Sequence, residues 1–460
     1  MFASLIAARM LGPSEFGIWS AILLVFSYAY FSELGVGLAM GRQIPYLKSK
    51  GREGEIPGVI DTGFTVLLAT SLLAALAIFI GTYFFFSESI VSYLRPATAV
   101  FVAIQIYIFC RSVCRGEAKF VIQSKAEVIL GASYLLLVAI FTRRFGVYSL
   151  LLAMLTANMV AIAYILKAAR IRLNLKLRRK YLKLVLGMGI QFFFISIVQC
   201  VYLTTDKLLA GRFFPVREFG IYNMAFMFSI FLNLFSQAMH ESFIPYTTMR
   251  YAATGDKEGV RAYLLSLLRM LNLFLPVLIG LVCISVGPAI KYFLPGYIQA
   301  VSITKIVIFA NFFYLTFNMS VQYFTAIGRP VKWIPYMLCG ILFNLVLGYT
   351  FIKMGLGIQW LAISVLVTSA FISLLLMLRV FIDYRRGALQ AGLLLARIYW
   401  PLIYALAAYF LARKLPGFFL QAGVFLLLAM PLLLVVFRLK REFSLTYQRI
   451  DSNVWDMRQD

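Results

Sequence analysis

The chain has 460 residues, of which 62% are hydrophobic and 13% charged, and its formal net charge is +25 at pH 7. A soluble globular domain has about 45–50% apolar and about 25% charged residues, and a water-facing protein of this size cannot bury so much apolar side chain. The composition therefore excludes a water-soluble protein and predicts an integral membrane protein.

Apolar runs follow one another along the whole chain, separated by short polar connections. A helix needs about 20 apolar residues to cross a bilayer, and on this basis we predict an all-α membrane protein with about fourteen transmembrane helices. In chain order the runs cover residues 1–10, 16–40, 59–86, 96–112, 126–142, 146–166, 184–211, 219–243, 263–287, 301–326, 335–352, 358–378, 394–412 and 418–437.

Lys and Arg are distributed unequally between the connections. The connections after even-numbered spans carry about three times as many Lys and Arg residues as the connections after odd-numbered spans. The densest cluster occupies residues 167–183. Because basic loops stay on the cytoplasmic side, we predict that this face and the C-terminal tail are cytoplasmic. This arrangement accounts for most of the net charge without nucleic acid.

Two segments of the sequence resemble each other. Residues Arg9–Trp19 recur as Arg212–Tyr222 at an offset of 203 residues, and the tripeptide Ile44–Tyr46 recurs as Ile244–Tyr246. The copies lie an even number of spans apart and therefore have the same orientation, which predicts two parallel six-helix lobes related by an axis along the membrane normal.

This repeat sets the predicted domain boundaries. We predict an N-terminal lobe at 1–166, a basic cytoplasmic linker at 167–183, a C-terminal lobe at 184–382, two extra transmembrane helices at 383–438 and a cytoplasmic tail at 439–460. Only about ten apolar residues precede the first copy of the repeat, too few to cross a bilayer. We therefore expect the first helix to be truncated, with its missing part encoded upstream of Met1; a re-entrant half-span is the alternative.

Several motifs resemble those of one transporter family. Residues Ala8–Gly17 resemble the A-R-x-L-G-P-x-x-[FY]-G signature of Wzx-type polysaccharide flippases, which belong to the multidrug/oligosaccharidyl-lipid/polysaccharide (MOP) exporter superfamily. Further family motifs are matched in order by Thr205–Lys207, Leu294–Ala300, Ala326–Arg329, and Asn344 with Gly355–Gly357. Two departures are a shifted glycine at position 296 and Gln359-Trp360 in place of the usual Gly-Ala.

The resemblance implies a function in polysaccharide biosynthesis, such as that of O-antigen and lipopolysaccharide. A flippase of this kind moves an oligosaccharide on a polyprenyl diphosphate carrier across the inner (cytoplasmic) membrane by alternating access. The expected partners are the lipid-linked oligosaccharide, membrane lipids and other polysaccharide-assembly proteins. The protein is not expected to be an enzyme or to hold a cofactor.

Ionisable residues inside predicted spans are functional candidates, because each costs about 2.5–3.5 kcal/mol at the bilayer centre. Lys and Arg suit a diphosphate, and we expect them to line a cleft between the lobes. The candidates for substrate binding are Arg9, Arg42, Lys207, Arg269, Lys305 and Asn344, and those for coupling to H⁺ or Na⁺ are Glu33 and Asp206. The alternative for each is a structural role, such as a Lys that extends to the membrane surface or a pair of neutralising charges.

Other functions stay open at this point. A multidrug exporter of the same superfamily would favour acidic cavity residues over basic ones. A membrane-embedded glycan polymerase usually needs a large periplasmic loop, which the short connections do not provide. An acyltransferase typically needs a catalytic histidine, and His240 is the one histidine of the chain. The five cysteines lie within apolar runs, with no spacing typical of a metal site.

Overall fold

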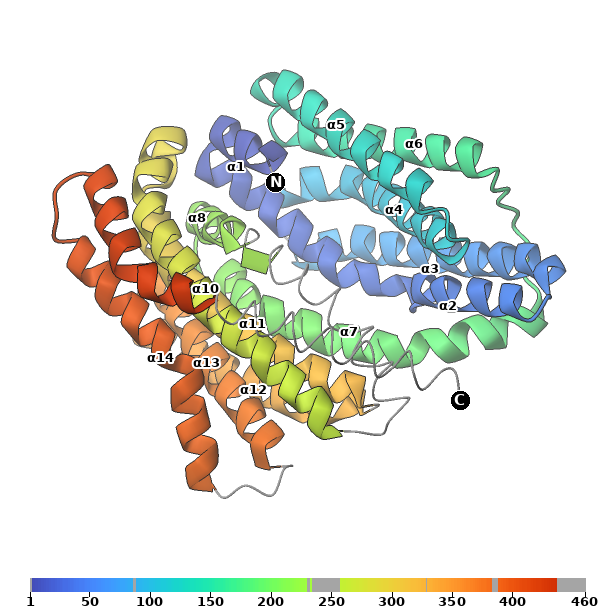
Figure 1. Ribbon diagram of the computed structural model, residues 1–460. Helices are drawn as coiled ribbons and strands as arrows, with labels where there is room; N and C mark the ends of the chain where they lie inside the picture. The colour runs from blue at the N-terminus through green and yellow to red at the C-terminus, as the bar shows by residue number, and fades with distance from the viewer. Residues whose placement is uncertain are drawn as a thin grey trace. The chain divides into compact units, whose positions relative to one another are not determined.

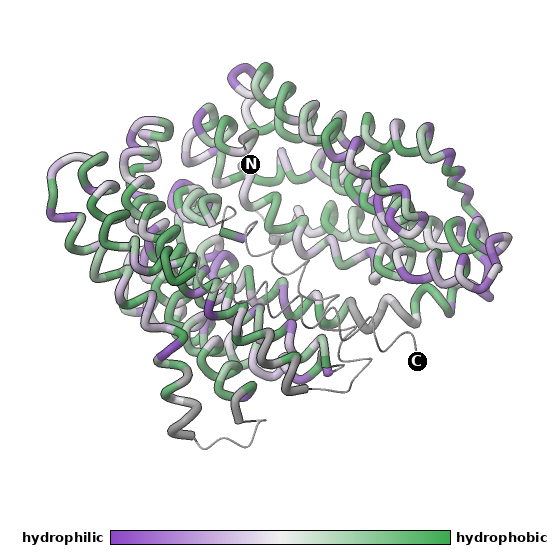
Figure 2. Tube along the Cα trace, in the orientation of Figure 1, coloured by the Kyte–Doolittle hydropathy of each residue, from purple (hydrophilic) through white to green (hydrophobic). Residues whose placement is uncertain are grey.

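The computed structural model describes residues 2–85, 88–229, 232–233, 257–327, 329–382 and 388–436. Within these ranges every regular element is a helix (Figure 1), and twelve helices are long and apolar enough to cross a membrane. Hydrophobic residues occupy the bodies of the helices, whereas hydrophilic residues gather at helix ends and connections (Figure 2). The protein is therefore a multi-pass helical membrane protein, and the predicted fold class is confirmed.

The chain forms two compact units, Met1–Asn223 and Met224–Asp460. The first contains α1 (Phe2–Ala29), the 3₁₀ helix η1 (Tyr30–Glu33), α2 (Val36–Ser49), η2 (Glu53–Glu55), α3 (Ile56–Phe85), α4 (Glu88–Gly116), α5 (Phe120–Phe145), α6 (Val147–Ala169) and α7 (Arg179–Phe213). Helix α8 (Val216–Met227) begins in the first unit and ends in the second.

The described part of the second unit continues with long helices. These are α10 (Lys257–Phe293), η3 (Pro295–Tyr297), α11 (Ala300–Ala326), η4 (Pro330–Trp333), α12 (Ile334–Lys353), α13 (Gln359–Ile382), α14 (Ala388–Ala412) and a last helix, Phe418–Val436. Inside this unit α13 packs against α11, α12 and α14.

The beginning of the chain differs from the expectation of two separate spans. The predicted runs 1–10 and 16–40 share α1, which is interrupted at Gly12 by a non-helical backbone (φ 72°, ψ 175°) just before Pro13. The run 16–40 is not one helix, because α1 ends at Ala29 and α2 begins only at Val36. Between them Gly35 adopts a left-handed φ of 74°, and a Cβ on it would lie 2.4 Å from the carbonyl oxygen of Gly189 in α7. Hydropathy does not register this break, because its polar residues Ser32 and Glu33 lie within a long, otherwise mostly apolar run.

Helix α7 packs within the first unit against α1, α2 and α3. The first unit therefore includes α7 and ends within α8, at Asn223. The division into two lobes of six helices stays a prediction. Residues 230–231 and 234–243 of the predicted span 219–243 lie outside the described residues, as do the second tripeptide of the repeat, His240 and the predicted tail 439–460.

The two copies of the sequence repeat meet inside the first unit. A Cβ on Gly17 would lie 2.1 Å from the Val216 carbonyl oxygen, and a Cβ on Gly220 would lie 2.0 Å from the Pro13 carbonyl oxygen. At the offset of 203 residues, Pro13 is equivalent to Val216 and Gly17 is equivalent to Gly220. A reciprocal contact of this kind is the pattern that a local two-fold axis produces. The glycines allow the backbones of α1 and α8 to touch.

Candidate functional site

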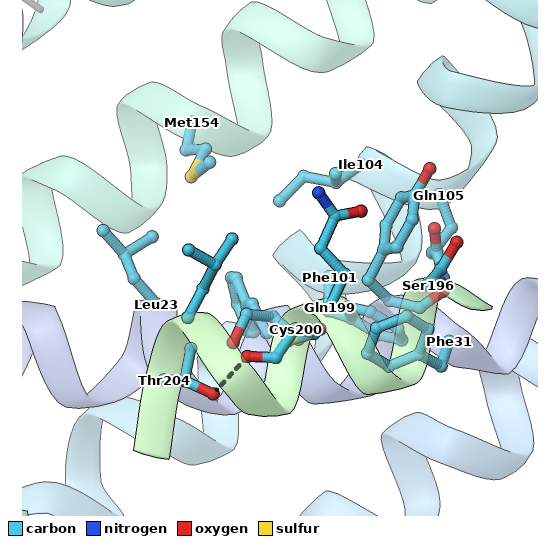
Figure 3. Close-up of a pocket in the computed structure, with 14 residues that line it drawn as sticks. Leu23, Phe31, Phe101, Ile104, Gln105, Met154, Ser196, Gln199, Cys200 and Thr204 are labelled. Carbon is cyan, nitrogen blue, oxygen red and sulfur yellow. Dashed lines mark hydrogen bonds between the residues drawn. The ribbon is translucent and has the colours of Figure 1, made fainter. Parts of the chain in front are cut away.

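A pocket of about 540 Å³ opens among five elements of the first unit. In Figure 3 the side chains of Leu23, Ile104 and Met154 border it from α1, α4 and α6, and α7 runs along its base. Its lining consists of Leu23, Phe26, Ser27, Tyr30, Phe31, Phe101, Ile104, Gln105, Met154, Ser196, Gln199, Cys200, Leu203 and Thr204.

The pocket lies near the middle of two long helices, α4 and α7. Its α4 residues, Phe101 to Gln105, are at the middle of a helix that runs from Glu88 to Gly116, and its α7 residues are near the middle of Arg179–Phe213.

Hydrogen bonds join the helices around the pocket. The hydroxyl groups of Tyr28 in α1 and Thr204 in α7 are 2.6 Å apart, and the Thr204 hydroxyl also donates to the Cys200 carbonyl oxygen at 2.7 Å. The Cys200 thiol lies 3.7 Å from the Ser27 carbonyl oxygen. These contacts fix α7 against α1 along one wall of the pocket.

Gln105 is the most deeply buried amide of the lining, with no exposed surface. Its Nε2 donates to the Tyr30 carbonyl oxygen at 3.3 Å and to the Ser32 hydroxyl at 3.1 Å, whereas its Oε1 has no hydrogen-bond partner. A buried acceptor without a partner is unfavourable and can accept a hydrogen bond from a ligand at little further desolvation. No lining residue carries a formal charge, so the pocket suits an uncharged group with apolar and hydrogen-bonding surfaces.

The structure brings together two of the residues predicted from sequence, Asp206 and Lys207 in α7. Asp206 is buried, accepts a hydrogen bond from the Tyr222 hydroxyl at 2.6 Å and lies 3.7 Å from Lys207 Nζ. Lys207 Nζ also donates to the Leu203 carbonyl oxygen at 2.8 Å. The Asp206 carboxylate thereby ties α7 to α8.

Glu33 is buried at the break between α1 and α2. Its Oε2 has no hydrogen-bond partner and lies beside Gly37, where a Cβ would be 3.1 Å both from this oxygen and from the Ser112 hydroxyl. A buried carboxylate oxygen without a partner can take up a proton or a small cation. Glu33 therefore stays a candidate for ion coupling.

The other predicted residues are separate from these groups. Arg9, Arg42 and Arg269 are exposed side chains of α1, α2 and α10. In the second unit Lys305 Nζ lies 3.1 Å from the Tyr409 hydroxyl, and the buried Asn344 accepts a hydrogen bond from the Ser364 hydroxyl at 2.9 Å. Among the described residues no three His, Cys, Asp or Glu side chains form a possible metal site.

None of the eight residues predicted from sequence lines the pocket. Gln105 and Gln199 were not among the candidates predicted from sequence, because those candidates were mainly charged residues within apolar runs. The signal was present, since an amide inside an otherwise apolar run is also costly to bury without partners.

Comparisons with known proteins agree with this architecture. A family model described as "Polysaccharide biosynthesis protein" matches residues 6–296. No curated protein sequence matches the chain.

Among solved structures, the fold resembles the lipid II flippase MurJ in an inward closed conformation, with a TM-score of 0.74 and 15% identity over 95% of this chain and 96% of that chain. It also resembles an inward-facing multidrug resistance MATE family transporter of the MOP superfamily, with a TM-score of 0.73 and 15% identity over 85% and 94% of the two chains. A MOP superfamily transporter from Pyrococcus furiosus matches with a TM-score of 0.60 and 15% identity over 83% and 90%. The fold is therefore that of MOP superfamily transporters and flippases.

Proposed function

This chain belongs to the polysaccharide biosynthesis protein family, and we propose that it is a flippase that moves a polyprenyl-diphosphate-linked oligosaccharide across the cytoplasmic membrane by alternating access. The observation that carries the proposal is the uncharged pocket near the middle of α4 and α7. Under the predicted division into two lobes, this pocket lies where the lobes meet. A glycan headgroup has to pass this depth, and a site between repeats can be exposed to either side in turn.

The lining of the pocket matches the chemistry of sugar rings. Aromatic faces such as those of Phe31 and Phe101 can pack against the C–H groups of a sugar, while the amides of Gln105 and Gln199 can bond to its hydroxyls. The prenyl tail needs no protein site, because it stays in the lipid. The diphosphate needs cations or hydrogen-bond donors, and for it we propose the substrate-binding candidates Arg9, Arg42, Lys207, Arg269, Lys305 and Asn344.

Glu33 and Asp206 are the proposed coupling residues for H⁺ or Na⁺. Asp206 already accepts a hydrogen bond from Tyr222 and lies near Lys207, whereas Glu33 has an oxygen without a partner. Of the two, Glu33 therefore has more capacity to take up an ion during transport. The proposed orientation has the basic connections and the C-terminus in the cytoplasm.

The proposal is tested by complementation of a strain that lacks its glycan flippase, together with translocation of lipid-linked oligosaccharide in proteoliposomes. Wild-type protein is expected to restore surface glycan and to translocate the substrate. The variants Q105L and Q199L are expected to lose most of this activity at normal membrane levels. The matched control is Q123L, which removes an amide of α5 that bonds to Glu127 and does not line the pocket. Wild-type protein without translocation in either assay would refute the proposal.

A multidrug exporter is the second candidate, because the apolar lining of the same pocket also suits a small uncharged compound, although it has none of the acidic residues expected for an exporter. It predicts that the chain lowers the accumulation of apolar compounds in cells, with Q105L and Q199L reducing that effect. Efflux without any restoration of glycan would assign the protein to this second function.

A further inference from the structure

The connection between α6 and α7 is an extended segment held rigidly against α3. The backbone N–H and the side-chain amide of Asn174 both donate to Asp61 Oδ1, at 3.2 and 3.3 Å, and the Arg178 N–H donates to the Thr62 hydroxyl at 3.2 Å. Asp61 and Thr62 are buried residues of α3. The segment is therefore a fixed part of the surface of the first unit.

Its side chains divide into an anchoring part and an exposed part. Ile171 and Leu173 pack against the apolar core of the first unit, whereas Leu175 and Leu177 are 65% and 59% exposed. Residues 170–180, which we call the basic strip, contain no acidic residue and have six cationic side chains, those of Arg170, Arg172, Lys176, Arg178, Arg179 and Lys180. Lys180 pairs with Glu55 at 3.0 Å.

Helix lengths place the basic strip at one boundary of the bilayer. Helix α6 has 23 residues and ends where the strip begins, so it spans about 34 Å, slightly more than the hydrocarbon thickness of about 30 Å. From Thr62 to its end at Phe85, α3 extends over a similar distance of about 35 Å. Both helices put the strip at the level of the lipid headgroups, and Figure 2 shows hydrophilic residues along this connection.

We propose that the basic strip binds the anionic phospholipid headgroups of the surrounding bilayer. The guanidinium and ammonium groups of the strip pair with the lipid phosphates, and Arg can do so through two parallel hydrogen bonds. Leu175 and Leu177 insert between the acyl chains just below. The rigid attachment to α3 lowers the entropic cost of binding, because the strip is already ordered. Lipid bound here bridges the end of α6, the start of α7 and α3.

The test compares lipid binding by the full-length purified protein in mixed micelles that contain phosphatidylglycerol or phosphatidylcholine. Native mass spectrometry counts bound lipid, and the apparent unfolding temperature reports stabilisation. Phosphatidylglycerol is expected to bind more copies and to stabilise the wild type more than phosphatidylcholine. The variant R172Q/K176Q/R178Q should lose at least half of this preference, because it removes three of the six cationic side chains of the strip. The strip should stay attached to α3, because the bond from residue 178 to Thr62 is donated by the backbone N–H. L175S/L177S should weaken binding of both lipids.

The matched control is R143Q/R144Q/R413Q, which removes three exposed arginines from the predicted opposite face and should keep the preference. An equal loss in this control, or an unchanged preference in the strip variant, overturns the proposal. Polyprenyl diphosphate added in place of phosphatidylglycerol distinguishes the source of the phosphate. Stabilisation by that compound alone would assign the strip to the substrate carrier and would also overturn the proposal.

Discussion

The contact between Gly17 and Gly220 predicts a specific sensitivity to added methyl groups. Ordinary van der Waals contact begins at about 3.4 Å, but a Cβ on Gly17 would be 2.1 Å from the Val216 oxygen and one on Gly220 would be 2.0 Å from the Pro13 oxygen. The obstacles are backbone atoms, which cannot rotate away. Either alanine would therefore force α1 and α8 apart by more than an ångström.

The expected cost follows from two opposing effects. Overpacking a tight contact costs about 1–3 kcal/mol, and replacement of a helical glycine by alanine gains up to about 1 kcal/mol in helix propensity. We expect G17A and G220A each to destabilise the protein by roughly 1–2 kcal/mol. Because the first alanine already separates the two backbones, the double variant should cost clearly less than the sum of the single variants.

The assay is thermal unfolding of the purified variants in one detergent, with G131A as the matched control. Gly131 is a helical glycine of α5 with no neighbouring atom within 4 Å of the position that a Cβ would take, so G131A should be neutral or stabilising. If G17A and G220A unfold at the same temperature as G131A, or if their effects add fully, the reciprocal backbone contact does not exist in the protein.

Three further predictions concern other contacts. D206A and Y222F should each lower the unfolding temperature, because each removes one partner of the 2.6 Å hydrogen bond between α7 and α8. Their effects should be non-additive in a double-mutant cycle, and additive effects would contradict the bond. D61A should speed tryptic cleavage within residues 170–180 several-fold, because it releases Asn174 from α3. The control is E53A, at an exposed residue, and equal cleavage rates in the two variants would contradict the attachment. In the second unit G280A should lower the unfolding temperature, because the added Cβ would lie 2.1 Å from the Phe425 ring. F425L should restore much of the lost stability, and an equally unstable G280A/F425L would refute the contact between Gly280 and Phe425.

The sequence predicted the helices well where an apolar run has polar ends. The run 358–378 corresponds to α13 (Gln359–Ile382), and 301–326 to α11 (Ala300–Ala326). It missed the break between α1 and α2, because that break depends on the left-handed Gly35 and its close approach to Gly189, not on hydropathy. A tertiary contact of this kind has no local signal beyond the glycine itself.

The pocket was less predictable than the helices. Charged residues in apolar runs were the natural candidates, but Lys207 is held by Leu203 and Asp206, and Lys305 by Tyr409. Such partners become visible only when the helices are packed. The repeat indicated that the two copies are related, and the structure adds that Gly17 and Gly220 touch.

The size of the pocket limits what the proposed flippase can recognise. At about 540 Å³ it lies within the range of pockets for small molecules, about 300–1,000 Å³, and holds only a short part of an oligosaccharide. Its lining bonds through uncharged groups such as Gln105 and Gln199, while the cations gather at the membrane boundary in the basic strip. Under the proposed function, selectivity therefore falls on the few sugars that occupy the pocket. Sugars farther along the chain contribute little to binding, so glycans that differ only in those sugars should be carried at similar rates.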